Sequence, residues 1–336
     1  MKWLLYYTKR FLLSGAALLL ALAACEGVLR GFGYYYVPFA IHAGGTTQDW
    51  RFKHVYEDAC FVSDPDLIWR PKPNAAVFNS QGFRGRELPP DKRPGELRVF
   101  AIGDSNTLGW DPEAPAEYHG ANWPEYLESL LAEATQKQVT VVNAGVWGYS
   151  SFQGVALTKR VLDYRPDIVL VSYGSNDAQR VAVSDDHFHT AVFRSAWGNL
   201  RTVQLMKAVC DRIGGAIPLR PEDYVFRVPV EKYRSNLQGI IRMCREQGVR
   251  CILLTRPFIG ESPGSWCWKT YAPDYVTATF AVGSEQEVPV VDVYRAFEDK
   301  PAMFADESHF TEEGHREAAK LICDTVLTVI DRKSDK

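Results

Sequence analysis

The chain has 336 residues, of which 46% are hydrophobic and 24% are charged, a composition typical of a globular protein with a substantial core. Its formal net charge of −3 gives no global electrostatic case for binding nucleic acid, so no nucleic-acid partner is expected. The sequence contains no internal repeat and no low-complexity segment, which excludes repeat arrays and leaves one or two ordinary domains.

Residues 1–30 have the pattern of a targeting segment. Lys2, Lys9 and Arg10 carry positive charge, and an uncharged, mostly apolar run over 11–24 follows them. A run of this length suits a signal peptide better than a full membrane span, which needs about 20 apolar residues. Positive charge on the N-terminal side keeps that end in the cytoplasm. The body is therefore expected outside it, in the bacterial periplasm or cell envelope.

The end of this segment is compatible with two kinds of tether. Leu22-Ala23-Ala24-Cys25 resembles a bacterial lipobox, in which the cysteine is lipidated after cleavage, so Cys25 is the lipidation candidate. The competing interpretation is an uncleaved anchor that extends to Leu29. The two alternatives stay open here, and both attach the protein to a membrane.

The cysteines are compatible with disulfides but do not form a metal-binding pattern. Of the seven cysteines, six remain if Cys25 carries lipid, and these could form disulfides in an oxidising compartment. No Cys-x-x-Cys pair or Cys/His cluster has zinc-site spacing, so no metal is expected. The acidic and histidine-rich segment 185–189 lacks a third distant ligand and is interpreted as a solvated loop.

Residues 31–94 are rich in aromatic residues, proline, glycine and arginine, without helical periodicity. We interpret them as an extended arm packed on the main domain, because a disordered linker would carry fewer large apolar residues. The main domain is expected over 95–330, and a polar tail over 331–336 follows it.

From residue 97 onward, apolar β-type segments alternate with amphipathic helical segments. After the first strand, helices are predicted over 123–134, 152–164, 233–247, 271–281 and 312–330. Further strands are predicted over 139–142, 167–173, 250–255 and 288–294. This alternation predicts a three-layer α/β/α fold with about five parallel strands and right-handed crossovers. A long stretch over 178–228 interrupts it, and such an insertion is usually functional or a small subdomain, which could roof a cleft.

The stretch around Ser105 is the most informative part of the chain. The apolar run 99–102 ends abruptly in Gly103-Asp104-Ser105-Asn106, and a glycine permits a tight exit from a strand. Loops beyond strand ends carry the reactive groups of α/β proteins, so the Ser105 hydroxyl can point into a cleft. Alone, Gly-Asp-Ser is weak evidence, because all three are ordinary turn residues.

Three further blocks complete this motif. They contain Gly145 after the second strand, Asn176 after the third, and His309 before the last helix. Ser105, Gly145, Asn176 and His309, with Asp306 three positions before the histidine, resemble the SGNH (GDSL-type) hydrolase family in identity and order. The resemblance covers about 97–330 and implies a flavodoxin-like fold that needs no metal or cofactor.

The chemistry also follows from the residue types. Acyl transfer needs an activated nucleophile, a base, a group that orients the base, and donors for the oxyanion. Ser105 is the candidate nucleophile, His309 the base and Asp306 the orienting carboxylate, which are also the roles in the family. The candidate oxyanion donors are the backbone N–H groups of Ser105 and Gly145 and the side-chain amide of Asn176.

Neighbours of these residues are expected to hold the loops by local hydrogen bonds. The four positions are Asp104, Asn106, Asn143 and Asp177.

Other residues near the motif are expected to have structural roles. Thr311 is expected to cap the last helix, and His315 to lie on that helix's surface. For Trp110, Trp147 and Tyr149, core packing is the commoner role, although aromatic residues near a cleft can stack on sugars.

These features predict a membrane-tethered, extracytoplasmic serine esterase. Its substrate would be a small-molecule or glycan ester, such as an O-acetyl group on an envelope glycan, or a lipid ester. An O-acyltransferase remains open, since a sugar hydroxyl can replace water with the same triad. A non-catalytic glycan-binding or assembly protein also remains, because fold does not fix function.

Overall fold

The computed structural model describes residues 2–32, 34, 60–89, 91–109, 120, 122–181, 183–194, 197–214, 225–259 and 268–331. Trp110, Cys267 and the tail residues 332–336 lie outside the described residues, as do 35–59 of the proposed arm.

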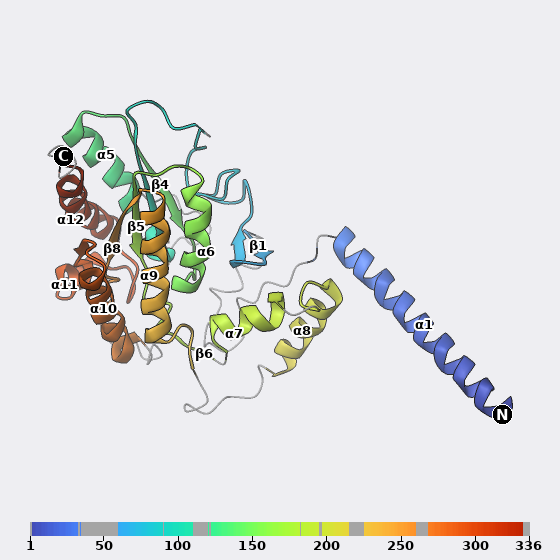
Figure 1. The fold of residues 1–336 in the computed structure, drawn as a ribbon. Helices are drawn as coiled ribbons and strands as arrows, with labels where there is room; N and C mark the ends of the chain where they lie inside the picture. The colour runs from blue at the N-terminus through green and yellow to red at the C-terminus, as the bar shows by residue number, and fades with distance from the viewer. Residues whose placement is uncertain are drawn as a thin grey trace.

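A five-stranded parallel sheet forms the centre of the main domain (Figure 1). Its strands are β3 (Leu97–Gly103), β4 (Val139–Gly145), β5 (Ile168–Ser172), β8 (Arg250–Leu254) and β9 (Val290–Val291). Their spatial order is β4-β3-β5-β8-β9, with Val99 of β3 level with Val141 on one side and Ile168 on the other. This is the flavodoxin-like order, so the predicted fold class is confirmed.

Helices cover both faces of the sheet. Val99 and Ala101 of β3 face a cluster formed with α5 (Trp123–Thr135), α11 (Val293–Phe297) and α12 (Glu312–Asp331). Phe100 and Ile102 face a second cluster, formed with α6 (Ser151–Leu162), α9 (Val230–Glu246) and α10 (Trp268–Glu285). The alternation follows from the two-residue period of a strand, and both faces of β3 are buried.

The described part of residues 31–94 packs on the sheet. Strands β1 (Phe61–Asp64) and β2 (Ile68–Pro71) form an antiparallel pair. Phe83 lies edge-on to Phe100 of β3, with ring centroids 5.4 Å apart, and Trp69 is fully buried in the same cluster. Each such fully buried side chain contributes about 1.5–3 kcal/mol, so residues 60–89 stabilise the fold.

The last predicted strand is shorter than expected. The apolar pattern predicts a strand over 288–294, but β9 has only two residues and α11 begins at Val293. The Asp292 carboxylate accepts a hydrogen bond from the backbone N–H of Arg295 at 3.1 Å. This N-cap starts a helix where the apolar pattern alone indicated a continuing strand.

The insertion after β5 contains regular elements. They are β6 (Arg180–Val181), α7 (Asp185–His189), a π turn (Thr190–Arg194), α8 (Arg201–Gly214) and β7 (Val225–Phe226). The expectation of a solvated loop over 185–189 is wrong, because Asp185 is buried and pairs with Arg227 at 2.9 Å. His189 Nε2 also lies 2.7 Å from the carbonyl oxygen of Pro65, so both side chains hold the fold.

Helix α1 (Lys2–Gly31) projects away from the rest of the molecule (Figure 1). The stretch Tyr6–Gly31 is long and apolar enough to cross a membrane. The most apolar part of this stretch is not buried against the rest of the protein. A signal sequence has the same properties. The helix is continuous beyond the apolar run recognised over 11–24.

Candidate active site

The turn that carries Ser105 lies at the carboxyl end of β3, an inner strand flanked by β4 and β5. Asp104 follows β3 and caps the short helix α4 (Ser105–Leu108), accepting from the backbone N–H of Asn106 at 2.9 Å. Ser105 is therefore the first residue of α4. The site lies between β3 and β5, where the strand order reverses and where open α/β sheets bind ligands.

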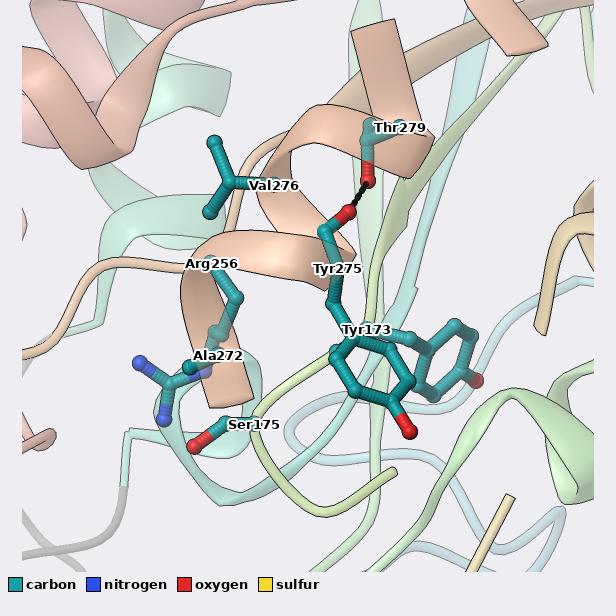
Figure 2. A pocket seen from close by; sticks show the side chains of 8 residues that line it. Tyr173, Ser175, Arg256, Ala272, Tyr275, Val276 and Thr279 are labelled. Atoms are coloured by element: carbon teal, nitrogen blue, oxygen red, sulfur yellow. Dashed lines mark hydrogen bonds between the residues drawn. The ribbon is translucent and has the colours of Figure 1, made fainter. Parts of the chain in front are cut away.

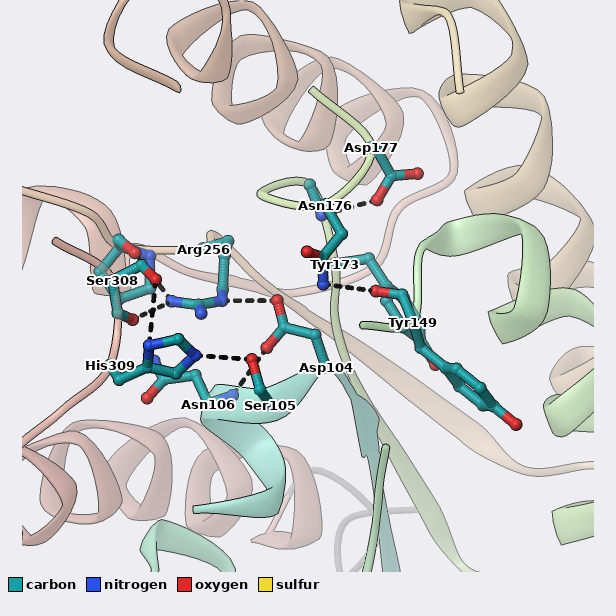
Figure 3. Close-up of polar contacts among 12 residues, drawn as sticks. Asp104, Ser105, Asn106, Tyr149, Tyr173, Asn176, Asp177, Arg256, Ser308 and His309 are labelled. Atoms are coloured by element: carbon teal, nitrogen blue, oxygen red, sulfur yellow. Dashed lines mark hydrogen bonds and ion pairs between the residues drawn. The ribbon is translucent and has the colours of Figure 1, made fainter. Parts of the chain in front are cut away.

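The structure brings Ser105 and His309 together (Figure 3), and Asp306 contacts the other nitrogen of the imidazole. Ser105 Oγ lies 2.7 Å from His309 Nε2, and His309 Nδ1 lies 2.7 Å from Asp306 Oδ2. A carboxylate facing Nδ1 favours the tautomer with the proton on that nitrogen. An unprotonated Nε2 can accept the proton of the serine hydroxyl, which is the first requirement of acyl transfer.

Asp306 is held as a carboxylate. Burial alone would raise its pKa, but the hydrogen bonds and charge of His309 and the backbone N–H groups of Ser308 and His309 outweigh burial. They lower the pKa of Asp306 to about 2. An ionised Asp306 can fix the imidazole, and it would stabilise an imidazolium if His309 took up a proton.

The candidate oxyanion donors lie around the same edge of the sheet. The Gly145 N–H donates to Asn143 Oδ1 at 3.0 Å. One hydrogen of the Asn176 amide goes to the carbonyl oxygen of Tyr149 at 2.9 Å. The amide has a second hydrogen, and the N–H of Ser105 stands at a helix start, where no intrahelical acceptor exists.

Close packing gives a further reason for glycine at position 145. A Cβ there would overlap the backbone of Thr107 and Leu108 in α4. The end of β4 therefore supports the helix that carries Ser105.

Two of the expected neighbours tie the site's loops together. Asn106 Oδ1 accepts from the backbone N–H of Phe310 at 3.1 Å, linking α4 to the histidine loop. Asn143 Nδ2 donates to the carbonyl oxygen of Thr107 at 2.8 Å.

Asp177 lies behind Asn176 and is fully buried. It accepts from the backbone N–H groups of Ser151 at 3.0 Å and Gly174 at 3.1 Å. Burial raises its pKa to about 7 against the opposing effect of the Ser151 hydrogen bonds. This carboxyl group connects the start of α6 to the loop that carries Asn176.

Sequence reasoning missed Arg256. It follows β8 and is buried against the site, with Nε donating to Asp104 Oδ2 at 2.8 Å and Nη1 donating to the carbonyl oxygen of Ser308 at 2.7 Å (Figure 3). Its only signal in the sequence was a position just beyond a predicted strand, on the same edge of the sheet as Ser105.

The expectation that His315 lies on the surface is wrong. His315 is buried beside Phe310, with ring centroids 5.5 Å apart. Burial lowers its pKa to about 3, and the positive charge of Arg84 acts in the same direction. The sequence pattern placed it on a helix but could not show which face the neighbouring loop covers.

The capping and aromatic residues have structural contacts. Thr311 Oγ1 accepts from the backbone N–H of Gly314 at 3.2 Å, as expected for a cap of α12. Tyr149 is buried and its hydroxyl donates to the carbonyl oxygen of Trp69 at 2.7 Å, which places it in the core. Trp147 is buried as well.

A narrow pocket lies beside the site, lined by Ser175, Arg256, Tyr275 and neighbouring residues (Figure 2). Among the residues that the structure describes, no hydrogen-bond partner reaches the buried Ser175 hydroxyl. The segments 110–119 and 260–267, which follow the Ser105 helix and β8 in sequence, lie outside the described residues. Ser175 and Arg256 therefore line a small pocket next to the loop that carries Asn176.

Within the described ranges, no group of three or more His, Cys, Asp or Glu side chains could hold a metal ion. Several cysteines there are free thiols, with Cys244, Cys251 and Cys323 buried and Cys25 and Cys210 exposed.

Comparison with known proteins gives a family. The family model of GDSL-like Lipase/Acylhydrolase matches residues 101–317. An arylesterase of Vibrio mimicus is 34% identical over 84 residues, which are 25% of this chain and 39% of the arylesterase. The match thus spans well under half of that relative's length.

Two solved structures are also similar. A lipase/acylhydrolase from Enterococcus faecalis is 23% identical, with 68% of this chain and 94% of that chain covered and a TM-score of 0.45. A catalytic mutant of an acetylxylan esterase from Geobacillus stearothermophilus is 18% identical, with 67% and 92% covered and a TM-score of 0.44. The family match covers more than half of the sequence and includes Ser105, Gly145, Asn176, Asp306 and His309. The chain belongs to the GDSL-like lipase/acylhydrolase family.

Proposed function

We propose that this protein is a serine esterase that is tethered to a membrane and acts outside the cytoplasm. The observation that carries the proposal is the hydrogen-bonded chain from Ser105 Oγ through His309 to Asp306, at distances of 2.7 Å and 2.7 Å. The family match supports the same chemistry, because it contains all three residues.

In the first half-reaction, Ser105 Oγ attacks the carbonyl carbon of an ester while its proton passes to His309 Nε2. The bond to the leaving alcohol then breaks, and the imidazolium returns the proton to that oxygen. The acyl group stays on Ser105. Water attacks it next, again with His309 as base, and releases a carboxylic acid and the free serine.

The oxyanion that forms in each step needs hydrogen-bond donors that are already in place. We assign this role to the N–H of Ser105, the second amide hydrogen of Asn176 and the N–H of Gly145. Gly145 contributes when its hydrogen bond to Asn143 is shared with the substrate oxygen.

The substrate is an ester of a small molecule or a glycan, and no metal or cofactor enters the reaction. The arylesterase name of the curated relative supports a small ester, and a location outside the cytoplasm favours an O-acetylated envelope glycan or a lipid ester. The tether is α1 as an anchor, or lipid on Cys25 after cleavage, and the N-terminal apolar helix supports both.

Hydrolysis of p-nitrophenyl acetate by the full chain in detergent tests this proposal. Ser105→Ala and His309→Ala should each lower kcat by about 10³-fold or more. Ser129→Ala is the matched control, because Ser129 lies on an exposed part of α5. An inert original chain, or equal activity in Ser105→Ala, would rule out the esterase. Acyl groups that accumulate on an added glycan, beyond free acid released, would point to the acyltransferase instead.

A further inference from the structure

Helix α8 carries a stripe of exposed apolar side chains. Met206, Val209 and Ile213 are 64%, 48% and 70% exposed, and Trp197, in the turn before the helix, is 69% exposed. Spacings of three and four residues place the three helical side chains on one face. A contiguous exposed apolar surface of this kind marks an interaction site.

The opposite face of α8 packs on the protein. Gln204 is buried and donates from its amide to the carbonyl oxygen of Gly198 at 3.1 Å. Ala208 packs against the main hydrophobic cluster. The catalytic domain therefore contacts one face of α8, and the exposed apolar stripe is on the opposite face.

The stripe lies on the side of α8 that meets the end of α1. Thr202 stands one helical turn before Met206, and its backbone N–H and hydroxyl donate to Glu26 Oε2 at 2.9 and 3.1 Å. The backbone N–H of Arg201 donates to Glu26 Oε1 at 3.0 Å. A carboxylate from α1 thus satisfies the first N–H groups of α8, which have no intrahelical acceptor.

Helix α1 determines where this junction lies relative to a bilayer. Its apolar stretch Tyr6–Gly31 has 26 residues and is about 39 Å long, compared with a hydrocarbon core of about 30 Å. Glu26 and Arg30 are at the end nearest the body, so they belong at the membrane surface. Arg30 also donates to the carbonyl oxygen of Asn199 at 3.2 Å, just before α8 begins.

We propose that α8 is a second membrane contact, lying in the bilayer surface with Met206, Val209 and Ile213 among the acyl chains. Trp197 takes the headgroup level, where tryptophan is enriched. This contact fixes how the catalytic domain is turned about its tether. The inference rests on the proposed tether and holds for both of its forms, because cleavage before Cys25 leaves Glu26 in place.

The test uses the full-length protein in vesicles of phosphatidylethanolamine and phosphatidylglycerol with brominated acyl chains. A genetically encoded fluorescent amino acid replaces Met206 or Ile213, one at a time. Phe280, a 39% exposed side chain of α10, is the matched control position. Bromine quenches only nearby fluorophores, so quenching at 206 and 213 should be several-fold stronger than at 280. Glu26→Ala should reduce the quenching at 206.

Flotation and ester hydrolysis in the same samples separate the possible failures. If the protein floats with the vesicles but quenching at 206 and 213 equals that at 280, the α8 contact is overturned and the tether stands. A protein that does not float overturns both the tether and the α8 contact. Retained hydrolysis of p-nitrophenyl acetate shows that each labelled protein is folded and that the esterase proposal is unaffected.

Discussion

Arg256 and Asp104 form a buried ion pair, Nε to Oδ2 at 2.8 Å, directly behind the proposed nucleophile. Asp104 precedes Ser105 in the chain, and the other end of the guanidinium donates to the carbonyl oxygen of Ser308, which precedes His309. Arg256 therefore connects the two loops that must hold Ser105 Oγ and His309 Nε2 in register. We therefore propose that Arg256 is a positioning residue, which acts on catalysis through its neighbours.

Arg256→Met should lower the free energy of unfolding by about 3–5 kcal/mol, because it leaves the Asp104 carboxylate buried without its cation. Arg256→Lys should restore part of the stability but not the activity, since an ammonium group cannot span both loops as the planar guanidinium does. Urea denaturation and kcat for p-nitrophenyl acetate measure the two effects. Full activity in Arg256→Lys would argue against the positioning role.

Asp306→Asn should leave the fold intact and lower kcat by about 10³–10⁴-fold, because an amide in this place favours the wrong imidazole tautomer. The KM should change little, as Asp306 contacts the histidine and not the substrate. Steady-state kinetics on a purified variant with unchanged circular dichroism provides the measurement. A loss of less than about tenfold would mean that the carboxylate does not orient His309.

Gly145→Ala should destabilise the protein by about 1–3 kcal/mol and lower kcat, because the added methyl group meets the backbone of α4. Gly239→Ala is the matched control, since a Cβ at Gly239 in α9 has open space around it. That change should stabilise the helix by about 0.5–1 kcal/mol. If both variants behave alike in thermal unfolding, close packing at Gly145 is not the constraint.

Asp177 should make stability fall as pH rises. Its pKa is about 7 in the folded protein against an ordinary 3.8, so between these values the folded state keeps a proton that the unfolded state has lost. Asp177→Asn removes that slope. The free energy of unfolding of the variant, relative to that of the unsubstituted protein, should therefore rise between pH 3.8 and about 7 in urea titrations.

His315 should change stability with pH in the opposite direction from Asp177, which provides an internal control. Its pKa is about 3 when folded against an ordinary 6.5, so its contribution to stability rises with pH over that window. His315→Leu should lose stability relative to the original chain as pH rises from about 3 to 6.5. If the relative stability of both variants changes with pH in the same direction, the assignment whose predicted direction fails is contradicted.

The sequence was sufficient for the parts of the fold that depend on local pattern. Continuous apolar runs such as 168–172 predict strands covered on both faces, and the residues after those runs converge because parallel strands share one carboxyl edge. The position of Ser105 at the carboxyl end of β3, on the same edge as Gly145 and Asn176, follows from this rule. The strand over 288–294 failed because the Asp292 cap overrides an apolar pattern that fits both element types.

Contacts between distant segments could not be predicted in the same way. Arg256 and Asp104 are separated by 152 positions, and nothing local to either residue indicates the other. The burial of His315 depends on the loop around Phe310, and that of Asp185 on Arg227. A single sequence gives residue types and spacing, whereas these pairings depend on how the finished layers pack.

The most direct test of the central claim is mass spectrometry of the full chain after reaction with a fluorophosphonate, which modifies only an activated serine. The expected result is one adduct per chain on the peptide that contains Ser105, and none in Ser105→Ala or His309→Ala. An original chain that takes up no label, or an adduct on another serine that persists in Ser105→Ala, would contradict the assignment of Ser105 as the nucleophile.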